Sequence, residues 1–392
     1  MKISLDKAIE LINDNIIMKE QETVFIGESL GRTLAENIYA CVDNPPFNRS
    51  PYDGYALKAA ETPGGFKVTG VNYAGKPSKF NITSGEAVRI MTGGAIPDGA
   101  DCVVPQEAAH RGEEYVEIND KYSANDNFIR KGEDFLKGEQ LVKKNKKLCP
   151  ADMALIAAGG IDRIKVYPRL SVSVISTGNE IVEAGKNIEF GQIYDTNLIY
   201  VASRLMELGC DVVHTDTVYD DMRHISEAVS KSALISDLIV TTGGVSVGEK
   251  DLVPEAVKSA GAEIVFHGID IKPGMPTMLS VLDNKSAVLS LSGNPFAAAV
   301  GLEVIGRHII SAASGNPSVL PVRFNSVLAN GFEKRSKSRR FIKAVEKNGI
   351  VTIPVSQGNS SLKSTAECNC FIDVPAGTEK LNAGDRVVIF FA

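Results

Sequence analysis

The chain has 392 residues, of which 44% are apolar and 23% charged, and its formal net charge is -6. This length exceeds one ordinary core, and the composition is that of a folded protein, which excludes the disordered and fibrous classes. The negative charge provides no basic field for nucleic acid or an anionic membrane, and we find no apolar run of the roughly 18 residues that a spanning helix needs. We therefore predict a cytoplasmic protein of several domains with no nucleic-acid or membrane partner.

The N-terminal third changes character near residue 44. Before it, Leu5, Ala8 and Ile12 follow helical spacing, and "GESLGRTLAENI" offers a second helix or turn. From 44 to about 138 the chain is rich in Pro and Gly, with short runs such as "FKVTG" and "EYVEI" that predict a β domain. At the boundary, "NPPFNRSPYDGYAL" is stiffened by prolines and carries the turn dipeptide Asp53-Gly54. This segment is either a rigid turn only or a way to present Asp53 to a neighbouring domain.

The next part of the chain alternates strands and helices. "ADMALIAAGG" predicts a helix that ends at Gly159, and from 170 to about 314 strands such as "LSVSVIST" and "DLIVTTGG" alternate with helices such as "TNLIYVASRLMELG". Such alternation requires crossover connections, so we predict a mostly parallel, doubly wound sheet with helices on both faces. After 316 the pattern becomes short strands, with a hairpin around Asn348-Gly349, which predicts a small β barrel or sandwich.

Glycines and polar or acidic residues follow the carboxyl ends of the predicted parallel strands. Ligands settle at this edge because glycine turns and helix N-termini converge there. The strand ends supply the following candidates: Thr177, Gly178, Glu180, Asp220, Gly243, Gly244, Gly293, Asn294 and Pro295.

The stretch "TTGGVSVGEKDLV" resembles a phosphate-binding P-loop without its lysine. Gly243 and Gly248 have the P-loop separation, but Glu249 stands at the lysine position and no Ser or Thr follows Lys250. Glycine N–H groups suit a phosphate, whereas the nearby carboxylates would repel it, so the combination suggests Mg²⁺, with Lys272 as the best candidate for the missing lysine. The plainer alternatives stay open: the acidic residues can be helix caps or solvated loop residues, and the glycines simple turns.

Eight motifs in order resemble the molybdopterin molybdenumtransferase family, the MoeA proteins and the E domain of gephyrin. They are "SPYDGYA", "RIMTGGAIPDGADCVVPQE", "IRKGED", "STGNEI", "GQIYDTN", "TTGGVSVGEKD", "KPGMP" and "SGNP". The resemblance implies a homodimer of four-domain chains: an elongated, discontinuous N-terminal domain (1–45 and 139–169), an inserted β domain (46–138), a molybdopterin-binding α/β domain (170–316) and a C-terminal β-barrel domain (317–392).

The resemblance also implies an activity, the Mg²⁺-dependent insertion of molybdate into adenylylated molybdopterin with release of AMP. Molybdopterin adenylyltransferase and molybdoenzyme apoproteins or their chaperones are the implied protein partners. Asp53 and Asp134 would reach the site from the partner subunit, and Glu180, Asp220 and Asp251 would hold the metal. The implied catalytic residues are Asp53, Asp134, Glu180, Asp220, Asp251 and Lys272. The implied substrate-binding residues are Thr92, Thr177, Gly178, Gly243, Gly244, Ser246, Gly293, Asn294, Pro295, Arg339 and Arg340.

Three residues depart from the family pattern: Met275 replaces the second lysine of K-P-G-K-P, Ser292 replaces the first proline of L-P-G-N-P, and Tyr52 replaces a common methionine. The first change removes a cation from the expected oxyanion pocket. A non-catalytic pterin-binding or peptide-binding scaffold, a paralogue that handles tungstate, and a molybdopterin adenylyltransferase therefore remain alternatives.

Overall fold

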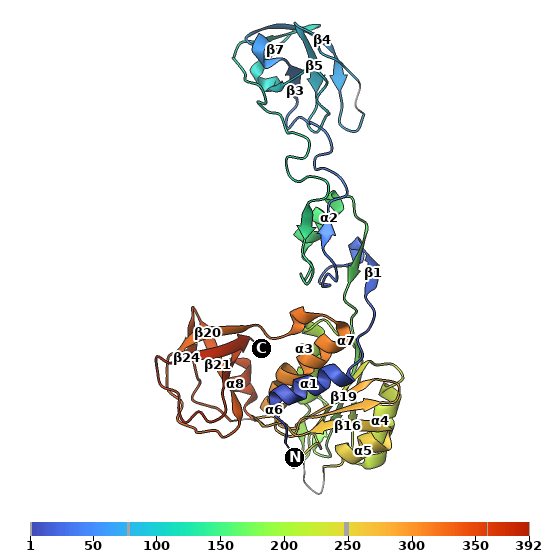
Figure 1. The fold of residues 1–392 in the computed structure, drawn as a ribbon, viewed down its shortest axis with the longest axis vertical. Helices are drawn as coiled ribbons and strands as arrows, with labels where there is room; N and C mark the ends of the chain where they lie inside the picture. Colours follow the sequence, from blue (N-terminus) through green and yellow to red (C-terminus); the bar gives the residue numbers. More distant parts are fainter. Residues whose placement is uncertain (1, 77–78, 247–250, 359, 392) are drawn as a thin grey trace. The chain divides into compact units, whose positions relative to one another are not determined.

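The structure is a computed structural model that describes residues 2–76, 79–246, 251–358 and 360–391. Its contacts divide the chain into two compact units (Figure 1). The first unit comprises Met1–Glu22, Gly31–Ala35 and Lys165–Ala392, and the second Thr23–Leu30 and Glu36–Ile164. The four predicted domain boundaries stay a prediction, since this division is coarser.

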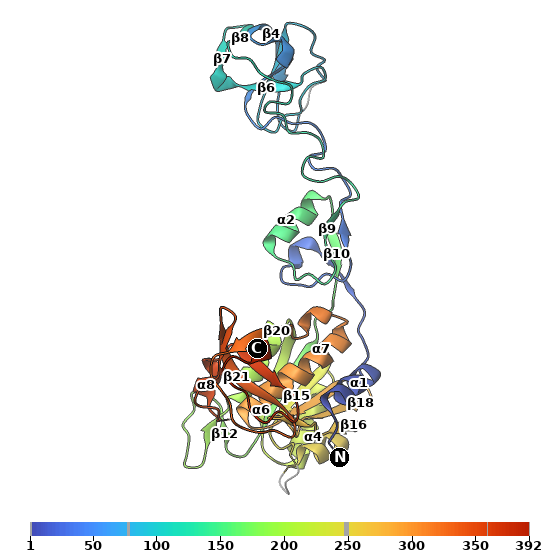
Figure 2. The same ribbon diagram turned by 60° about the vertical axis from the view of Figure 1, so that its left-hand side comes forward.

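The second unit contains the predicted β domain. Its six-stranded sheet has the order β6-β3-β5-β4-β8-β7. Figure 2 labels β4, β6, β7 and β8 of this sheet. Alternate side chains of these strands point inward, so that Leu57, Phe66 and Val104 are buried in one core. The strands are β3 (Gly54–Leu57), β4 (Gly64–Asn72), β5 (Glu86–Ile90), β6 (Cys102–Pro105), β7 (Ala109–Arg111) and β8 (Tyr115–Ile118).

The rest of the second unit is built from short elements. Helix α2 (Pro150–Ala158) begins with a capping box in which Cys149 and Asp152 satisfy each other's backbone groups, and it ends at Gly159 as predicted. The segment "GESLGRTLAENI" forms no second α-helix and contributes only its first two residues to the short 3-10 helix η1 (Ile26–Glu28), because its glycines interrupt the helical apolar spacing. Two short ladders join β2 (Ile38–Tyr39) to β9 (Gln140–Val142) and β1 (Glu22–Phe25) to β10 (Arg163–Val166).

The first unit is organised around a second six-stranded sheet of order β14-β11-β15-β19-β18-β16. Strands β14, β11, β15 and β19 are parallel, and β18 runs antiparallel to both of its neighbours. The strands are β11 (Ser171–Thr177), β14 (Asp211–Val218), β15 (Leu238–Thr242), β16 (Ala262–His267), β18 (Met278–Leu282) and β19 (Ala287–Leu291).

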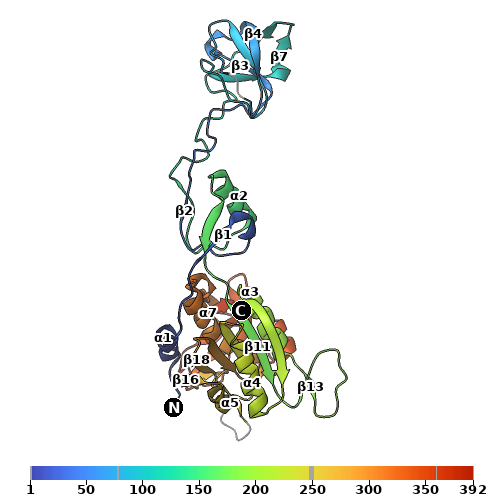
Figure 3. The ribbon, with the colours of Figure 1, turned by 90° about the vertical axis from the view of Figure 1, so that its right-hand side faces the viewer.

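Helices cover both faces of this sheet, which confirms the doubly wound prediction. One face packs against α1 (Leu5–Asn15), α3 (Asn197–Glu207), α6 (Pro295–Gly301) and α7 (Arg307–Ser314), and α1 lies alongside α7 and β16 (Figure 3). The other face packs against α4 (Met222–Ser232) and α5 (Val253–Ser259). A π-helical stretch, η4 (Leu302–Gly306), joins α6 to α7. The strand ends are thereby fixed in a buried scaffold.

The C-terminal strands form a closed five-stranded barrel in the order β21-β22-β20-β24-β23 and back to β21. A parallel pairing of β17 (Ile271–Lys272) with β21 joins the barrel to the α/β part of the same unit. The predicted hairpin is confirmed, with Asn348 and Gly349 both at positive φ between β21 and β22. The barrel elements are β20 (Arg323–Leu328), β21 (Arg339–Lys347), β22 (Ile350–Thr352), α8 (Leu362–Ala366), β23 (Cys370–Val374) and β24 (Arg386–Phe391). A short pair, β12 (Ile181–Val182) and β13 (Ile193–Tyr194), precedes α3.

Candidate functional site

Three loops at the carboxyl ends of β11, β15 and β19 pack directly on one another. Gly243 has a φ of +96°, and a Cβ added there would lie 2.4 Å from the Thr177 carbonyl oxygen, so only glycine fits. A Cβ added at Gly293 would lie 3.4 Å from the Gly243 Cα, and Gly243 N–H donates to Leu291 O at 3.1 Å. The backbones of the three loops therefore lie close together here, because Gly243 and Gly293 have no side chains that would separate them.

Asp220 lies beside these loops in an environment that opposes its charge. Its N–H donates to Asn179 Oδ1 at 3.2 Å. Burial, together with the negative charges of Glu180 and Asp251, raises the pKa of Asp220, although the nearby Thr177 hydroxyl favours the charged form. Among the described residues, Asp220 Oδ1 and Thr177 Oγ1 are buried without a hydrogen bond of normal geometry. No Lys, Arg or His of the described ranges forms an ion pair with Asp220.

Glu180 folds back over the same turn. A Cβ added at Gly178 would lie 3.0 Å from Glu180 Oε2, so the carboxylate lies close to the Gly178 backbone. The three predicted metal ligands thus influence one another, yet no three Asp, Glu, His or Cys side chains of the described ranges gather as a preformed metal-binding group.

Asn197 and Asn294 complete this edge. Asn197, the first residue of α3, donates from Nδ2 to Gly293 O at 2.8 Å. Asn294 precedes α6, and its Oδ1 is buried with no hydrogen-bond partner in the described chain. Pro295 begins the helix, where its missing N–H is no loss. We name the strand-end site after these loops: Thr177 to Glu180, Asp220, Gly243, Gly244, and Gly293 to Pro295.

Comparisons with known proteins cover almost the whole chain. Family models match as the MoeA N-terminal region (domain I and II) over residues 3–160, a probable molybdopterin binding domain over 173–312, and the MoeA C-terminal region (domain IV) over 325–390. A molybdopterin molybdenumtransferase from Staphylococcus aureus is 33% identical over 398 residues, which cover 99% of this chain and 95% of that protein. The chain belongs to the molybdopterin molybdenumtransferase family.

Further relatives agree with this assignment to a family of transferases. A molybdopterin molybdenumtransferase from Staphylococcus epidermidis is 32% identical over 396 residues, covering 98% of this chain and 94% of that protein. The crystal structure of a molybdopterin biosynthesis MoeA protein from Pyrococcus horikoshii matches with a TM-score of 0.84 and 30% identity over 100% of this chain and 99% of that chain. The MoeA-like multidomain architecture expected from the motifs is confirmed.

This MoeA-family chain also has a pocket apart from the strand-end site, where β17, α6 and the barrel meet. Its volume is about 270 Å³. Arg340 is only 7% exposed and lies over the Phe332 ring at 5.6 Å. Its Nη1 and Nη2 donate to Lys334 O and Arg335 O at 3.3 and 3.4 Å, while Nε is buried without a partner in the described chain. We call it the basic pocket; its lining residues are Lys272, Pro273, Phe296, Phe332, Lys334, Arg340, Phe341, Ile342 and Gln357.

Arg339 and Arg340 lie in different surroundings although they are adjacent. Arg339 donates to both carboxylate oxygens of Asp373 at 2.7 and 2.6 Å and lines another pocket, so much of its charge is already compensated. Arg323 also pairs with Asp373. Of the two arginines that the sequence predicts for substrate binding, only Arg340 lines the basic pocket together with Lys272.

The residues predicted in the second unit form two pairs. Asp53 accepts from Thr92 N–H at 2.7 Å and from the Thr92 hydroxyl at 2.8 Å, and these bonds lower the pKa of Asp53. Asp134 accepts from Asn44 Nδ2 at 2.9 Å. These residues belong to the compact unit that does not contain the strand-end site. Their predicted approach from a partner subunit stays a prediction.

The glycine-rich stretch is described only in part. Ser246 is exposed, and Asp251 is half-buried ahead of α5. Gly248, Glu249 and Lys250 lie outside the described residues. Sequence reasoning missed Asn179, Asn197 and Lys334. Asn197 could have been found from its place in "DTN", since a polar residue at the start of a helix after a strand lies at the ligand edge.

One helix of the described chain meets the length and composition of a membrane-spanning segment, although Glu303 and Arg307 interrupt its apolar residues. The continuous helix Pro295–Ser314 has 20 residues and is apolar enough to cross a membrane by length and composition, with 78% of its apolar window buried inside the protein. It is the core helix α6-η4-α7, because its side chains fill the main hydrophobic cluster.

Proposed function

We propose that this chain catalyses the insertion of molybdenum from molybdate into adenylylated molybdopterin, with release of AMP, in molybdenum cofactor biosynthesis. The main support is the environment of Asp220, whose pKa is raised by burial and by the negative charges of Glu180 and Asp251. Asp220 lies beside glycine turns whose backbone groups are not covered by side chains of their own. Membership of the molybdopterin molybdenumtransferase family supports the same reaction.

The strand-end site supplies the groups that an adenylylated pterin needs. Turn N–H groups and the amino end of the long helix that begins at Pro295 favour a phosphate through backbone dipoles. The Thr177 hydroxyl and Asn294 Oδ1, both buried and unsatisfied within the described chain, are available for polar groups of the substrate. These residues bind and orient the adenylyl phosphate for attack.

Mg²⁺ fits this site because Asp220 Oδ1 is an oxygen ligand without a partner in the described chain. Mg²⁺ takes one or two carboxylates plus phosphate oxygens and waters, so it does not need a preformed cluster of three. Asp220 would hold the ion with support from Glu180 and Asp251. The ion would neutralise charge on the adenylyl phosphate as AMP leaves.

The basic pocket is the proposed place of the molybdate oxyanion. Lys272 and Arg340 line it, and Phe296, the residue after Pro295, forms part of its wall. The pocket therefore adjoins the helix start that contributes to the strand-end site. Cationic side chains in a partly desolvated pocket hold an oxyanion and its developing charge in place.

A homodimer is part of the proposal, with Asp53 and Asp134 of one chain acting at the strand-end site of its partner. A groove of about 540 Å³ along α3, which includes Tyr194, Ile199 and Tyr200, supports an association surface. We also propose a cytoplasmic location, with a molybdopterin adenylyltransferase and molybdoenzyme apoproteins or their chaperones as transient partners.

The deciding experiment measures AMP release from adenylylated molybdopterin with Mg²⁺ and either molybdate or tungstate. We expect molybdate-dependent release. Pterin binding without AMP release would favour the non-catalytic scaffold, faster release with tungstate would favour the tungstate paralogue, and ATP consumption with free molybdopterin would favour the adenylyltransferase.

The family departures give the scaffold no structural support. Ser292 Oγ accepts from Asn294 N–H at 3.2 Å, so the turn before α6 is formed without a proline at 292. Met275 lies in the turn after Lys272 and does not line the basic pocket.

A further inference from the structure

We propose that Lys334 is the third cation of the basic pocket and sets the affinity of this chain for a doubly charged tetrahedral oxyanion. This inference rests on the proposed function and adds a residue to it. The lining of the pocket includes the cations Lys272, Lys334 and Arg340 and no carboxylate. A site of this composition has an excess of positive charge that an oxyanion compensates.

In the same segment, Arg335 and Arg339 are already paired, whereas Lys337 forms no ion pair among the described residues. Arg335 Nη2 lies 3.7 Å from Glu379 Oε1, and Arg339 Nη2 lies 2.6 Å from Asp373 Oδ2. No described acidic residue forms an ion pair with Lys272, Lys334 or Arg340. Lys272, Lys334 and Arg340 therefore keep their charge available for a ligand of the pocket.

Arg340 ties the main chain of Lys334 to the pocket. Its Nη1 donates to Lys334 O at 3.3 Å, which holds the start of the turn against the guanidinium group. Further along, Ser336 Oγ donates to Ser338 O at 2.7 Å and fixes the turn before β21. Lys334 lines the pocket and is exposed, so its flexible side chain is free to turn the ammonium toward an anion in the pocket.

The environment of Arg340 also supports a ligand in the basic pocket. Its side chain is more than nine-tenths buried, yet Nε has no hydrogen-bond partner among the described residues. A buried charged donor is costly when unsatisfied, and an oxyanion in the pocket would satisfy it. Lys334 then supplies a further charge from the rim, in addition to those of Lys272 and Arg340. Loss of one charge-assisted contact of this kind weakens binding about tenfold.

The test compares Lys334→Gln, Lys334→Arg and, as a matched control, Arg335→Gln. Arg335 is the next cation along the chain and is paired away from the pocket. Steady-state AMP release is measured against molybdate concentration at saturating adenylylated molybdopterin. We expect Lys334→Gln to raise KM for molybdate about tenfold with kcat nearly unchanged, and the other two variants to behave as wild type.

Direct binding of molybdate and of sulfate by calorimetry separates this inference from the proposed function. Absence of AMP release by the wild-type protein would refute the proposed reaction, while the calorimetry would still decide the role of Lys334. Equal molybdate affinity of wild type and Lys334→Gln, or an equal loss in Arg335→Gln, would overturn the inference. Because the Lys334 side chain is exposed, all variants are expected to melt at the wild-type temperature, and circular dichroism checks this.

Discussion

Asp220 combines a functional position with an unfavourable environment. Burial and the charges of Glu180 and Asp251 raise its pKa above the ordinary value of 3.8. A carboxyl group whose pKa is raised by folding stabilises the protein fully below its unfolded pKa, and this stability is lost as pH rises through the folded pKa. At neutral pH, the charged Asp220 therefore opposes folding.

We predict that Asp220→Asn raises the melting temperature at pH 7 while it lowers AMP release sharply. The gain should vanish below about pH 3.8, where the wild-type group is protonated in both states. Melting curves of both proteins across this pH range test the prediction. A lower melting temperature at pH 7 would mean that Asp220 supports the fold.

Gly54 fixes the chain next to Asp53. A Cβ added there would lie 2.1 Å from Val104 O, a backbone atom of the paired strand β6 that cannot move aside cheaply. We predict that Gly54→Ala lowers the free energy of unfolding by about 3 kcal/mol. Gly65→Ala in the same sheet is the control, because nothing lies within 4 Å of its added Cβ. Urea unfolding measures the free energy of unfolding of both variants. Similarly small losses in the two would contradict the prediction that Gly54 is required by its contact with β6.

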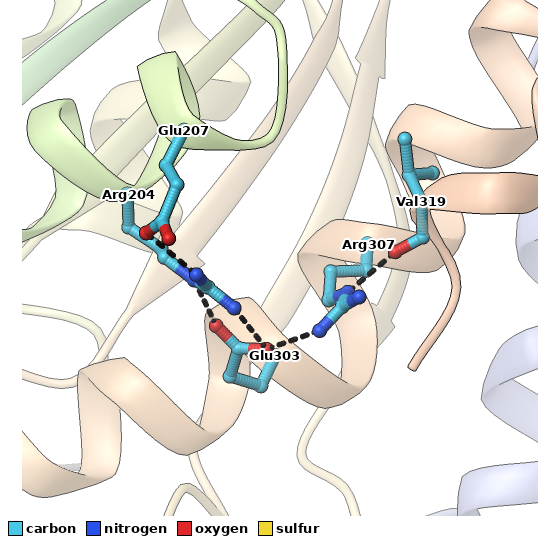
Figure 4. A network of polar contacts seen from close by, with 5 residues as sticks. All are labelled: Arg204, Glu207, Glu303, Arg307 and Val319. Carbon is cyan, nitrogen blue, oxygen red and sulfur yellow. Dashed lines mark hydrogen bonds and ion pairs between the residues drawn. The ribbon is translucent and has the colours of Figure 1, made fainter. Parts of the chain in front are cut away.

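A buried ion-pair network holds the helices of one sheet face together (Figure 4). Glu303, in the π-helical stretch η4, is fully buried and accepts from Arg204 Nε at 2.6 Å and Arg307 Nη1 at 2.8 Å. Arg307 Nε donates to Val319 O, which joins α7 to the segment that leads into the barrel. The network therefore connects α3, the core helix and the start of the C-terminal region.

We predict that Glu303→Ala lowers the free energy of unfolding by about 3–5 kcal/mol, because it leaves the largely buried Arg307 without a carboxylate and Arg204 with only the exposed Glu207. Glu227→Ala removes an exposed partner of Arg223 and should change stability by about 0.5 kcal/mol or less. Chemical denaturation of both variants measures the difference. A small loss in Glu303→Ala would mean that water replaces the carboxylate.

At the scale of elements, the sequence predicts what depends on local signals. Glycine turns after buried strands indicate the ligand edge, and helical spacing indicates α1 and α3. The reversed direction of β18 was not predictable, since a buried apolar strand reads the same in either direction. The different fates of Arg339 and Arg340 depend on strand register, and the bond between Asp53 and Thr92 joins residues 39 positions apart. Such contacts are set by tertiary structure.

At the scale of the whole molecule, the β domain of the second unit has its own core and a narrow attachment. Its sheet encloses a separate hydrophobic cluster. The two chain segments that lead to it meet at Asn44 and Phe135, whose backbones pair with an N–O distance of 2.9 Å. The two chain segments that enter and leave the β domain are therefore close enough at Asn44 and Phe135 for a short turn to join them.

We predict that replacing residues 46–133 with a short Gly-Ser turn leaves a cooperatively folded protein that binds molybdate but releases no AMP, because Asp53 and Thr92 are removed. Circular dichroism melting and calorimetry test the fold and the binding. Full-length Asp53→Asn, which keeps the sheet, should lose AMP release with an almost unchanged melting temperature. Full activity of the shortened protein would refute the role of Asp53 and Thr92.

The turn that precedes β21 determines which of two neighbouring guanidinium groups faces Asp373 and which faces the basic pocket. Successive residues of a strand point to opposite sides, so an indel in this turn that shifts the register of β21 by one residue would exchange the surroundings of Arg339 and Arg340, together with those of the other β21 side chains. Such an indel would move an uncompensated charge across the barrel wall. Loop length here is thus expected to be as strongly selected as the arginines themselves.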